Sequence, residues 1–140
     1  MQELIKKLEQ LLDKEEIDLK EVQNLKAEFL KKHIKGLKID DYIGDYPTFM
    51  EPVILGEKVK IGDDVLIGPN IYIGSNSIIG DYVEISNSIV LDNVTIGDNI
   101  KLVNCVIAGG SKLNFSNFNE KNCILKGTAN SIEELEMIYF

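Results

Sequence analysis

An apolar residue recurs about every six positions over more than half of this sequence. A glycine directly follows six members of the series, at positions 56, 62, 68, 74, 80 and 97. A second small or branched residue comes four positions after each opening residue, as Val59 and Val65 do. A short fixed period indicates an array of stacked units and takes precedence over strand-by-strand assignment. The opening residues are Phe49, Leu55, Ile61, Ile67, Ile73, Ile79, Ile85, Val90, Ile96, Leu102, Ile107 and Leu113.

The period predicts a triangular coil made of three units. Each opening residue points inward from a short strand, the following glycine adopts the backbone conformation of the corner, and coils stack at roughly 4.8 Å. The predicted inner columns are Leu55, Ile73, Val90, Ile107 and Ile124 on one face, Ile61, Ile79, Ile96 and Leu113 on the next, and Phe49, Ile67, Ile85 and Leu102 on the third. A β-sandwich would instead show alternating strands with turns every 8–12 residues, which fits this pattern poorly.

Two units, 85–89 and 102–106, are one residue shorter than the others. Because the shortening recurs once per coil, it keeps the columns aligned, and 119–123 is a candidate third copy. In this register Ile89 and Val106 point inward as the second residues of their units. Cys123 stacks after Val106, while Cys105 lies at a turn and points elsewhere. Two reduced thiols are therefore expected, with diverging side chains and neither a disulfide nor a metal site.

Units such as Leu55-Gly-Glu-Lys-Val-Lys and Ile79-Gly-Asp-Tyr-Val-Glu resemble the hexapeptide-repeat superfamily. The interleaved short unit 85–97, Ile-Ser-Asn-Ser-Ile-Val-Leu-Asp-Asn-Val-Thr-Ile-Gly, is similar to the C-terminal β-helix of sugar-phosphate nucleotidylyltransferases. The resemblance covers about residues 49–126. It implies a mainly β fold, a left-handed parallel β-helix of about four coils. The left-handed sense follows from the resemblance alone, since most parallel crossovers are right-handed.

The flanking segments predict additions to this body. Residues 1–40 have the apolar spacing of a helical hairpin, in which Asp18 caps the second helix and Gly36 ends it. Its apolar stripe runs through Val22, Leu25, Phe29 and Leu30. The tail from Ser131 has a capping-box spacing to Glu134 and predicts a short capping helix. The expected domains are a hairpin at 1–40, a β-helix at 41–128 and a capping segment at 129–140.

The distribution of charge excludes one class of partner. Residues 1–40 hold nine lysines and nine acids, so the net charge of −8 lies in the rest of the chain. An acidic body argues against nucleic-acid binding, and no apolar run reaches the ~20 residues of a membrane span. Met1 opens a Lys- and Glu-rich stretch rather than a secretion signal. We therefore expect no nucleic acid, no membrane and a cytoplasmic location.

The catalytic sets that the resemblance implies are missing from the sequence. Nucleotidylyltransferases open with a strand and a Gly-rich phosphate loop containing Arg, but this chain opens with a helical pattern and contains no Arg. Hexapeptide acyltransferases use a histidine as general base, and the only histidine, His33, falls outside the repeats in the second helix. The γ-class carbonic anhydrases bind metal through three histidines. We expect no catalytic residue, metal ligand or cofactor, and the cofactor-binding residues remain unknown.

Outward polar side chains are the remaining candidates for binding. Exposed Tyr and Lys are more often solvent-facing or subunit contacts than ligand pockets. The stretch 114–122, where the repeat is irregular, is either a loop-borne site or, more simply, a degraded last coil. The outward residues are Lys60, Tyr72, Tyr82, Glu84 and Lys101, with Tyr42 and Tyr46 in the linker.

Two hypotheses follow. The first is a non-catalytic β-helix, related to sugar-nucleotide metabolism by resemblance, that forms a homo-oligomer or docks on a protein partner as an accessory or regulatory subunit. The alternative is an acyl-CoA-dependent acyltransferase or nucleotide-sugar-binding enzyme that uses an Asp or Glu as base.

Overall fold

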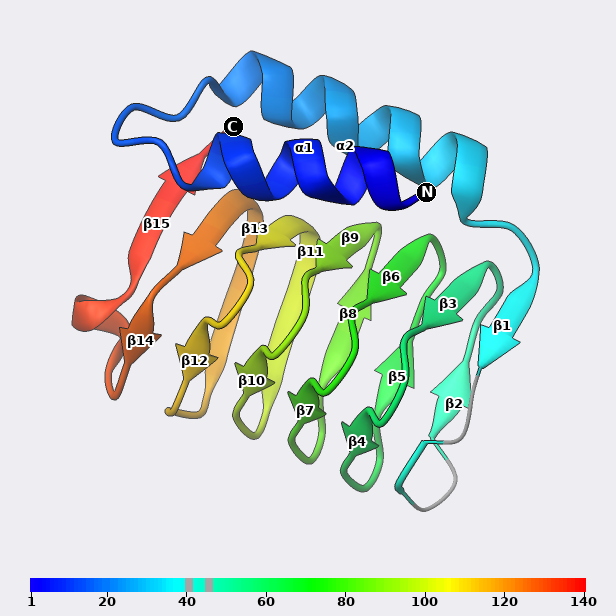
Figure 1. Ribbon diagram of the computed structural model, residues 1–140. Helices are drawn as coiled ribbons and strands as arrows, with labels where there is room; N and C mark the ends of the chain where they lie inside the picture. Colours follow the sequence, from blue (N-terminus) through cyan, green and yellow to red (C-terminus); the bar gives the residue numbers. More distant parts are fainter. Residues whose placement is uncertain (40–41, 45–46) are drawn as a thin grey trace.

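The computed structural model describes residues 1–39, 42–44 and 47–140. A pair of antiparallel helices lies across one side of a parallel β-solenoid of about five turns (Figure 1). The predicted hexapeptide-repeat β-helix and N-terminal helical hairpin are confirmed. The number of turns is slightly larger than expected, because the strand at Leu37–Ile39 already pairs with the first repeat.

The strands form three faces of a triangular prism. Strands β11 (Ile100–Ile107) and β13 (Phe118–Lys126) run around one corner. They join the first face, which the helices cover, and the third face into a single ten-stranded sheet. The helix-covered face contains β1 (Leu37–Ile39), β3 (Val53–Leu55), β6 (Ile71–Ile73), β9 (Ser88–Val90) and the later halves of β11 (Ile100–Ile107) and β13 (Phe118–Lys126). The second face contains β4 (Lys60–Ile61), β7 (Ile78–Ile79), β10 (Thr95–Ile96), β12 (Lys112–Leu113) and β14 (Thr128–Ala129). The third face contains β2 (Thr48–Phe49), β5 (Leu66–Ile67), β8 (Glu84–Ser86) and the first halves of β11 and β13.

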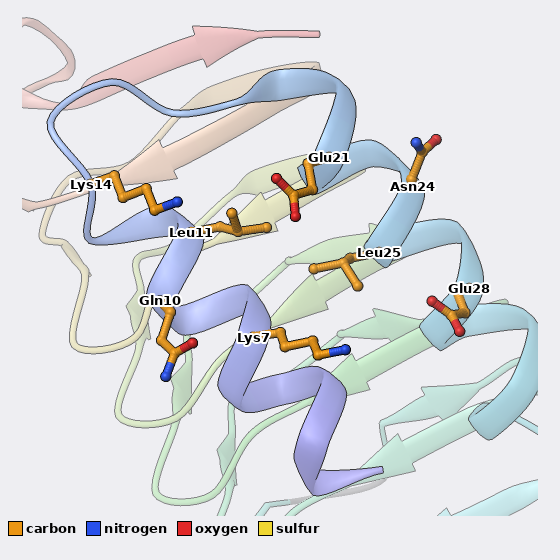
Figure 2. A pocket seen from close by; sticks show the side chains of 8 residues that line it. All are labelled: Lys7, Gln10, Leu11, Lys14, Glu21, Asn24, Leu25 and Glu28. Carbon is orange, nitrogen blue, oxygen red and sulfur yellow. The ribbon is translucent and has the colours of Figure 1, made fainter.

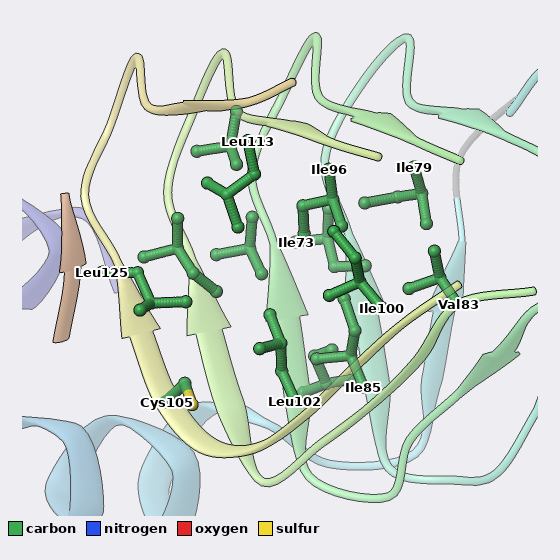
Figure 3. Close-up of a cluster of buried hydrophobic side chains, with 14 of the residues drawn as sticks. Ile73, Ile79, Val83, Ile85, Ile96, Ile100, Leu102, Cys105, Leu113 and Leu125 are labelled. Carbon is green, nitrogen blue, oxygen red and sulfur yellow. The ribbon is translucent and has the colours of Figure 1, made fainter. Parts of the chain in front are cut away.

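The inner columns follow the predicted six-residue register. On the second face, Ile61, Ile79, Ile96 and Leu113 pair in successive coils. Phe49, Ile67, Ile85 and Leu102 do the same on the third face. Figure 3 shows several of these side chains in the interior, among them Ile79, Ile96 and Leu113 of the second face and Ile85 and Leu102 of the third. Parallel strands buried on their inner side in this way obtain their stability from stacked branched side chains.

The corner glycines serve a different purpose from the one expected. The positive φ angle falls two residues later in the unit, for example at Asp64 (56°) or Asn76 (61°), and Asn is common there because it tolerates the left-handed region. At Gly80, a Cβ atom would lie 2.8 Å from the backbone carbon of Gly97 in the next coil. These glycines therefore permit coils to approach closely. Of the six that follow opening residues, Gly68 alone has a positive φ, of 105°, so the expectation that they provide the corner conformation is wrong for the other five.

The two short units turn their second residues outward. Ser88 and Cys105 occupy the interior, and Ile89 and Val106 face the helices instead. The prediction that Ile89 and Val106 point inward is therefore wrong. With one residue deleted, the inward position comes three residues after the opening residue rather than four, so the alternation of strand side chains shifts by one.

The last coil repeats the short unit, one residue later than predicted. Glu120 pairs with Leu102, Cys123 with Cys105 and Leu125 with Ile107, so the unit spans 120–124 rather than 119–123. Leu125, not Ile124, therefore completes the inner column of the helix-covered face. The stretch 114–122 forms a corner and the start of β13, which agrees with a last coil rather than an inserted loop.

Helices α1 (Gln2–Leu12) and α2 (Leu19–His33) pack on the helix-covered face. The Asp18 side chain accepts a hydrogen bond from the Glu21 amide at 3.2 Å, as predicted for the N-cap. Gly36 has a φ of 66° shortly after α2 ends. At the other end of the hairpin, Lys126 of β13 donates to the carbonyl of Leu12 at 2.5 Å and so caps α1 from the solenoid.

The C-terminal segment closes the far edge of the sheet. The short helix expected there is a single 3-10 turn (η1, Ile132–Glu134), and most of the segment is strand β15 (Glu136–Tyr139). β15 pairs antiparallel with β13. A terminal coil exposes unpaired backbone groups, and an antiparallel strand satisfies them along its length, which one helical turn cannot do.

Candidate functional site

The hairpin covers a continuous apolar column on the outside of the solenoid. Its residues come from the middle of three-residue apolar runs, such as Ile71-Tyr72-Ile73, and both sides of such strands are buried. Tyr72 contacts Phe29 of α2 edge to face, with 5.3 Å between ring centroids. The column consists of Ile54, Tyr72, Ile89, Val106 and Ile124.

The outward candidates from the sequence are distributed over different surfaces. Tyr72 is buried under the hairpin, and burial raises its pKa to about 12. Tyr82 is exposed at a corner with a φ of 58°. Lys101 and Glu84 form an exposed ion pair of 3.7 Å on the third face, which adds little stability.

Three further candidates lie away from these surfaces. Lys60 stands exposed on the second face. Tyr42 packs edge to face on Phe49 near the start of the solenoid, with 5.6 Å between the ring centroids. Tyr46 lies outside the described residues. The structure therefore does not bring the predicted binding residues into one place.

His33 occupies the last position of α2. Its imidazole packs against Phe29, with 5.6 Å between the ring centroids. Partial desolvation and nearby cationic groups lower its pKa. It belongs to the helical layer rather than to a coil of the solenoid, as the sequence predicts.

The two cysteines are neighbours, not divergent. Cys105 and Cys123 are register partners on β11 and β13, both buried and unlinked, with 3.7 Å between their Sγ atoms. The predicted divergence is wrong because the inward residue of a short unit comes three positions after the opening residue, which places Cys105 in the interior beside Cys123. The hydrogen bond between the sulfurs lowers the pKa of Cys105, and the same bond together with burial raises that of Cys123.

No group of three or more potential metal ligands occurs in the part of the chain that the structure describes. Among the same residues, no helix has the length and apolar character needed to cross a bilayer.

Figure 2 shows a groove of 380 Å³ between the outer sides of the two helices. Lys7 of α1 and Lys14, just after it, line the groove together with Glu21 and Glu28 of α2, so the charge of the groove is balanced. The Glu28 carboxylate accepts a hydrogen bond of 2.8 Å from the Lys32 ammonium group, and this contact lowers the pKa of Glu28. This groove has the character of a solvated helix–helix seam.

A second groove of 450 Å³ lies where α2 meets a corner of the solenoid. Lys26 projects into it and is only 5% exposed. Sequence reasoning missed this residue, although a signal was present. Lys26 comes four residues after Val22 and three before Phe29, which places a cation in the middle of the apolar stripe.

The sequence pattern of the GMPPB C-terminal domain matches residues 49–138. The chain belongs to this family. The match confirms the resemblance to nucleotidylyltransferase C-terminal β-helices that the repeats predicted, and it leaves α1 and α2 outside the family region.

Two solved structures are similar to this chain at low sequence identity. One is a hexapeptide-repeat-containing acetyltransferase from Vibrio cholerae O1 biovar eltor, complexed with acetyl coenzyme A, with 14% identity, a TM-score of 0.30 and coverage of 97% of this chain and 84% of that chain. The other is a maltose O-acetyltransferase from Clostridium difficile 630, with 18% identity and a TM-score of 0.26. The match covers 98% of this chain and 84% of that chain. No curated protein sequence matches the chain closely enough to count as a relative.

Proposed function

We propose that this GMPPB C-terminal-domain β-helix is a non-catalytic interaction protein, which forms a homo-oligomer or docks on a protein partner as an accessory subunit. The observation that carries the proposal is the unequal covering of the prism. The hairpin packs on the outward apolar column of one face, whereas outward residues of the second and third faces, such as Ile78 and Val103, are exposed.

The uncovered faces have the mixed chemistry of a non-obligate interface. Ile78 on the second face is 42% exposed, Tyr82 at the adjoining corner 58%, and Val103 on the third face 47%. Lys60 and Thr95 flank Ile78 in its outward row, and Lys112 follows Thr95. Apolar and aromatic side chains within a polar surrounding are typical of protein–protein contacts.

The position of His33 supports the same proposal. A general base must reach the proton that it removes, at hydrogen-bond distance or through one water. His33 packs on Phe29 at the end of α2, and it lines neither the groove between the two helices nor the groove that contains Lys26.

The partner follows from the family. A sugar-phosphate nucleotidylyltransferase encoded as a separate chain is the candidate for the accessory version of the proposal. Stacking of the two β-helices through their uncovered faces would bring this chain beside the catalytic subunit.

Sedimentation velocity tests self-assembly. We expect association between about 1 μM and about 100 μM, the range of micromolar affinity, and weaker association in Ile78→Glu and Val103→Glu. Ile132→Glu is the matched control, since Ile132 is similarly exposed (38%) but lies in the C-terminal cap. A monomer throughout this range contradicts self-assembly, and binding to a purified nucleotidylyltransferase then tests the accessory version.

The acyltransferase alternative is tested with the same preparation. Turnover of acetyl coenzyme A with amine, hydroxyl or sugar acceptors would overturn the non-catalytic proposal. Glu9 and Asp92 line a third groove, of 280 Å³, between the end of α1 and the solenoid, and their substitution would then test which carboxylate is the base.

A further inference from the structure

Lys26 is a buried cation in an apolar layer. It lies on the face of α2 that packs on the solenoid, beside Phe29 and Leu30. Only 5% of the residue is exposed. Its ammonium group makes no ion pair or hydrogen bond with any residue that the structure describes. Burial of the side chain leaves the ammonium group only partly solvated, with its accessible side toward a groove, so an anion in this groove would stabilise the charge.

The groove that receives Lys26 contains only neutral and cationic polar groups. Lys31 stands at its exposed side, one turn further along α2, and Gln23 lies one turn before Lys26. The opposite wall is a corner of the solenoid with Asn70, Asn87 and Asn104 in successive coils. No carboxylate lines this groove, although the protein as a whole carries a charge of −8. An anion is therefore attracted to this position and repelled by much of the remaining surface.

The asparagine row leaves hydrogen-bonding capacity at one end. Asn104 donates to Asn122 at 2.8 Å, and Asn87 donates to Asn104 at 3.4 Å. The Asn70 carboxamide makes no hydrogen bond to another described side chain, and Asn70 is exposed at the groove. A carboxamide both donates and accepts, which suits a hydroxyl group.

We propose that this groove binds a small phosphate monoester with a hydroxyl-bearing body, such as a sugar phosphate. The ammonium groups of Lys26 and Lys31 hold the phosphate, and the carboxamides of Gln23 and Asn70 contact the hydroxyls. The volume of 450 Å³ lies within the roughly 300–1,000 Å³ of small-molecule sites, so the groove takes a whole ester rather than a bare ion. Burial lowers the pKa of Lys26 to about 8, against an opposing contribution from the Cys105 sulfur, and the amine stays mainly protonated at neutral pH.

The test follows the lysine side chains directly. Protein labelled with ¹³C at lysine Cε is titrated by NMR with glucose 6-phosphate, inorganic phosphate and glucose at constant ionic strength. We expect saturable shifts of the Lys26 and Lys31 signals with glucose 6-phosphate, weaker binding of inorganic phosphate and no response to glucose. Equal binding of the ester and inorganic phosphate would overturn the roles of Gln23 and Asn70. A response to glucose, or no response to either phosphate compound, would overturn the site.

Variants separate binding from folding. Lys26→Met keeps the length of the side chain and removes the charge, so we expect it to fold with a raised melting temperature and to bind glucose 6-phosphate about tenfold more weakly or worse, as the loss of a charge-assisted contact implies. Lys20→Met is the matched control, because Lys20 is an exposed lysine of the same helix outside the groove. Unchanged binding by Lys26→Met, or an equal loss in Lys20→Met, would overturn the proposal.

Discussion

The thiols of Cys105 and Cys123 lie in contact inside the solenoid, with 3.7 Å between their Sγ atoms. They are register partners on the parallel strands β11 and β13. Neighbouring strands lie about 4.7–4.9 Å apart, which falls within the roughly 4.4–6.8 Å that Cα atoms span across a disulfide. The last complete coil can therefore be linked covalently to the coil before it.

Oxidation with diamide should produce this link. The two thiols give up two hydrogens to the diazene and form one S–S bond within the chain. Both cysteines are buried, so the reaction should be slow in native protein and faster in mild urea. Intact-mass measurement and non-reducing peptide mapping detect the product. Exclusive formation of intermolecular disulfides under native conditions would contradict the prediction.

The inner columns could be predicted from the sequence because a period of six leaves one choice of register. The interior position recurs at a fixed spacing, and Ile61, Ile79 and Ile96 show it without ambiguity. The same logic failed at the short units. A deletion can be absorbed before or after the inward residue, and spacing alone does not distinguish Ser88 from Ile89 as the buried side chain.

Features that depend on packing between elements were harder to predict. The apolar runs around Tyr72 indicate strands buried on both sides, but the sequence does not say that α1 and α2 provide the cover. Lys26 could be placed on the apolar stripe of its helix, yet its groove requires the Asn70–Asn104 corner, which lies far away in the chain. The antiparallel strand β15 was missed because Ser131 and Glu134, shortly before it, have the spacing of a helix start.

The contact between Tyr72 and Phe29 should hold the hairpin on the solenoid. Tyr72→Ala removes a buried ring and is expected to cost about 3 kcal/mol or more of unfolding free energy, of which the edge-to-face pair contributes about 1 kcal/mol. Urea unfolding followed by far-UV circular dichroism measures the loss. Tyr72→Phe is the control, since it keeps the ring. A loss in Tyr72→Ala no larger than in Tyr72→Phe would show that the hairpin is held elsewhere.

Two glycines provide a matched pair for the close approach of coils. At Gly80 a Cβ atom would lie 2.8 Å from the Gly97 backbone, whereas at Gly109 the nearest atom is 3.5 Å away, the carbonyl oxygen of Asp92. We expect Gly80→Ala to destabilise the protein by about 1–3 kcal/mol through overpacking. Gly109→Ala should be neutral or stabilise it by up to about 1 kcal/mol. Thermal unfolding compares the two, and equal effects would contradict the role of close approach.

Lys26 should make stability depend on pH above neutrality. Burial lowers its pKa from 10.5 to about 8 in the native state, so between these values the unfolded chain binds more protons and stability rises with pH. The variant Lys26→Met does not titrate at this position. Its stability advantage over the wild type should be largest at pH 7 and smaller at pH 10, by on the order of 1–2 kcal/mol given the residual access of solvent. Tyr72 and Tyr139, whose pKa values are raised to about 12, are present in both proteins and cancel in the comparison. Urea unfolding of both proteins at the two pH values measures the change, and an advantage that is the same at pH 7 and pH 10 would show that Lys26 is solvated in the native state.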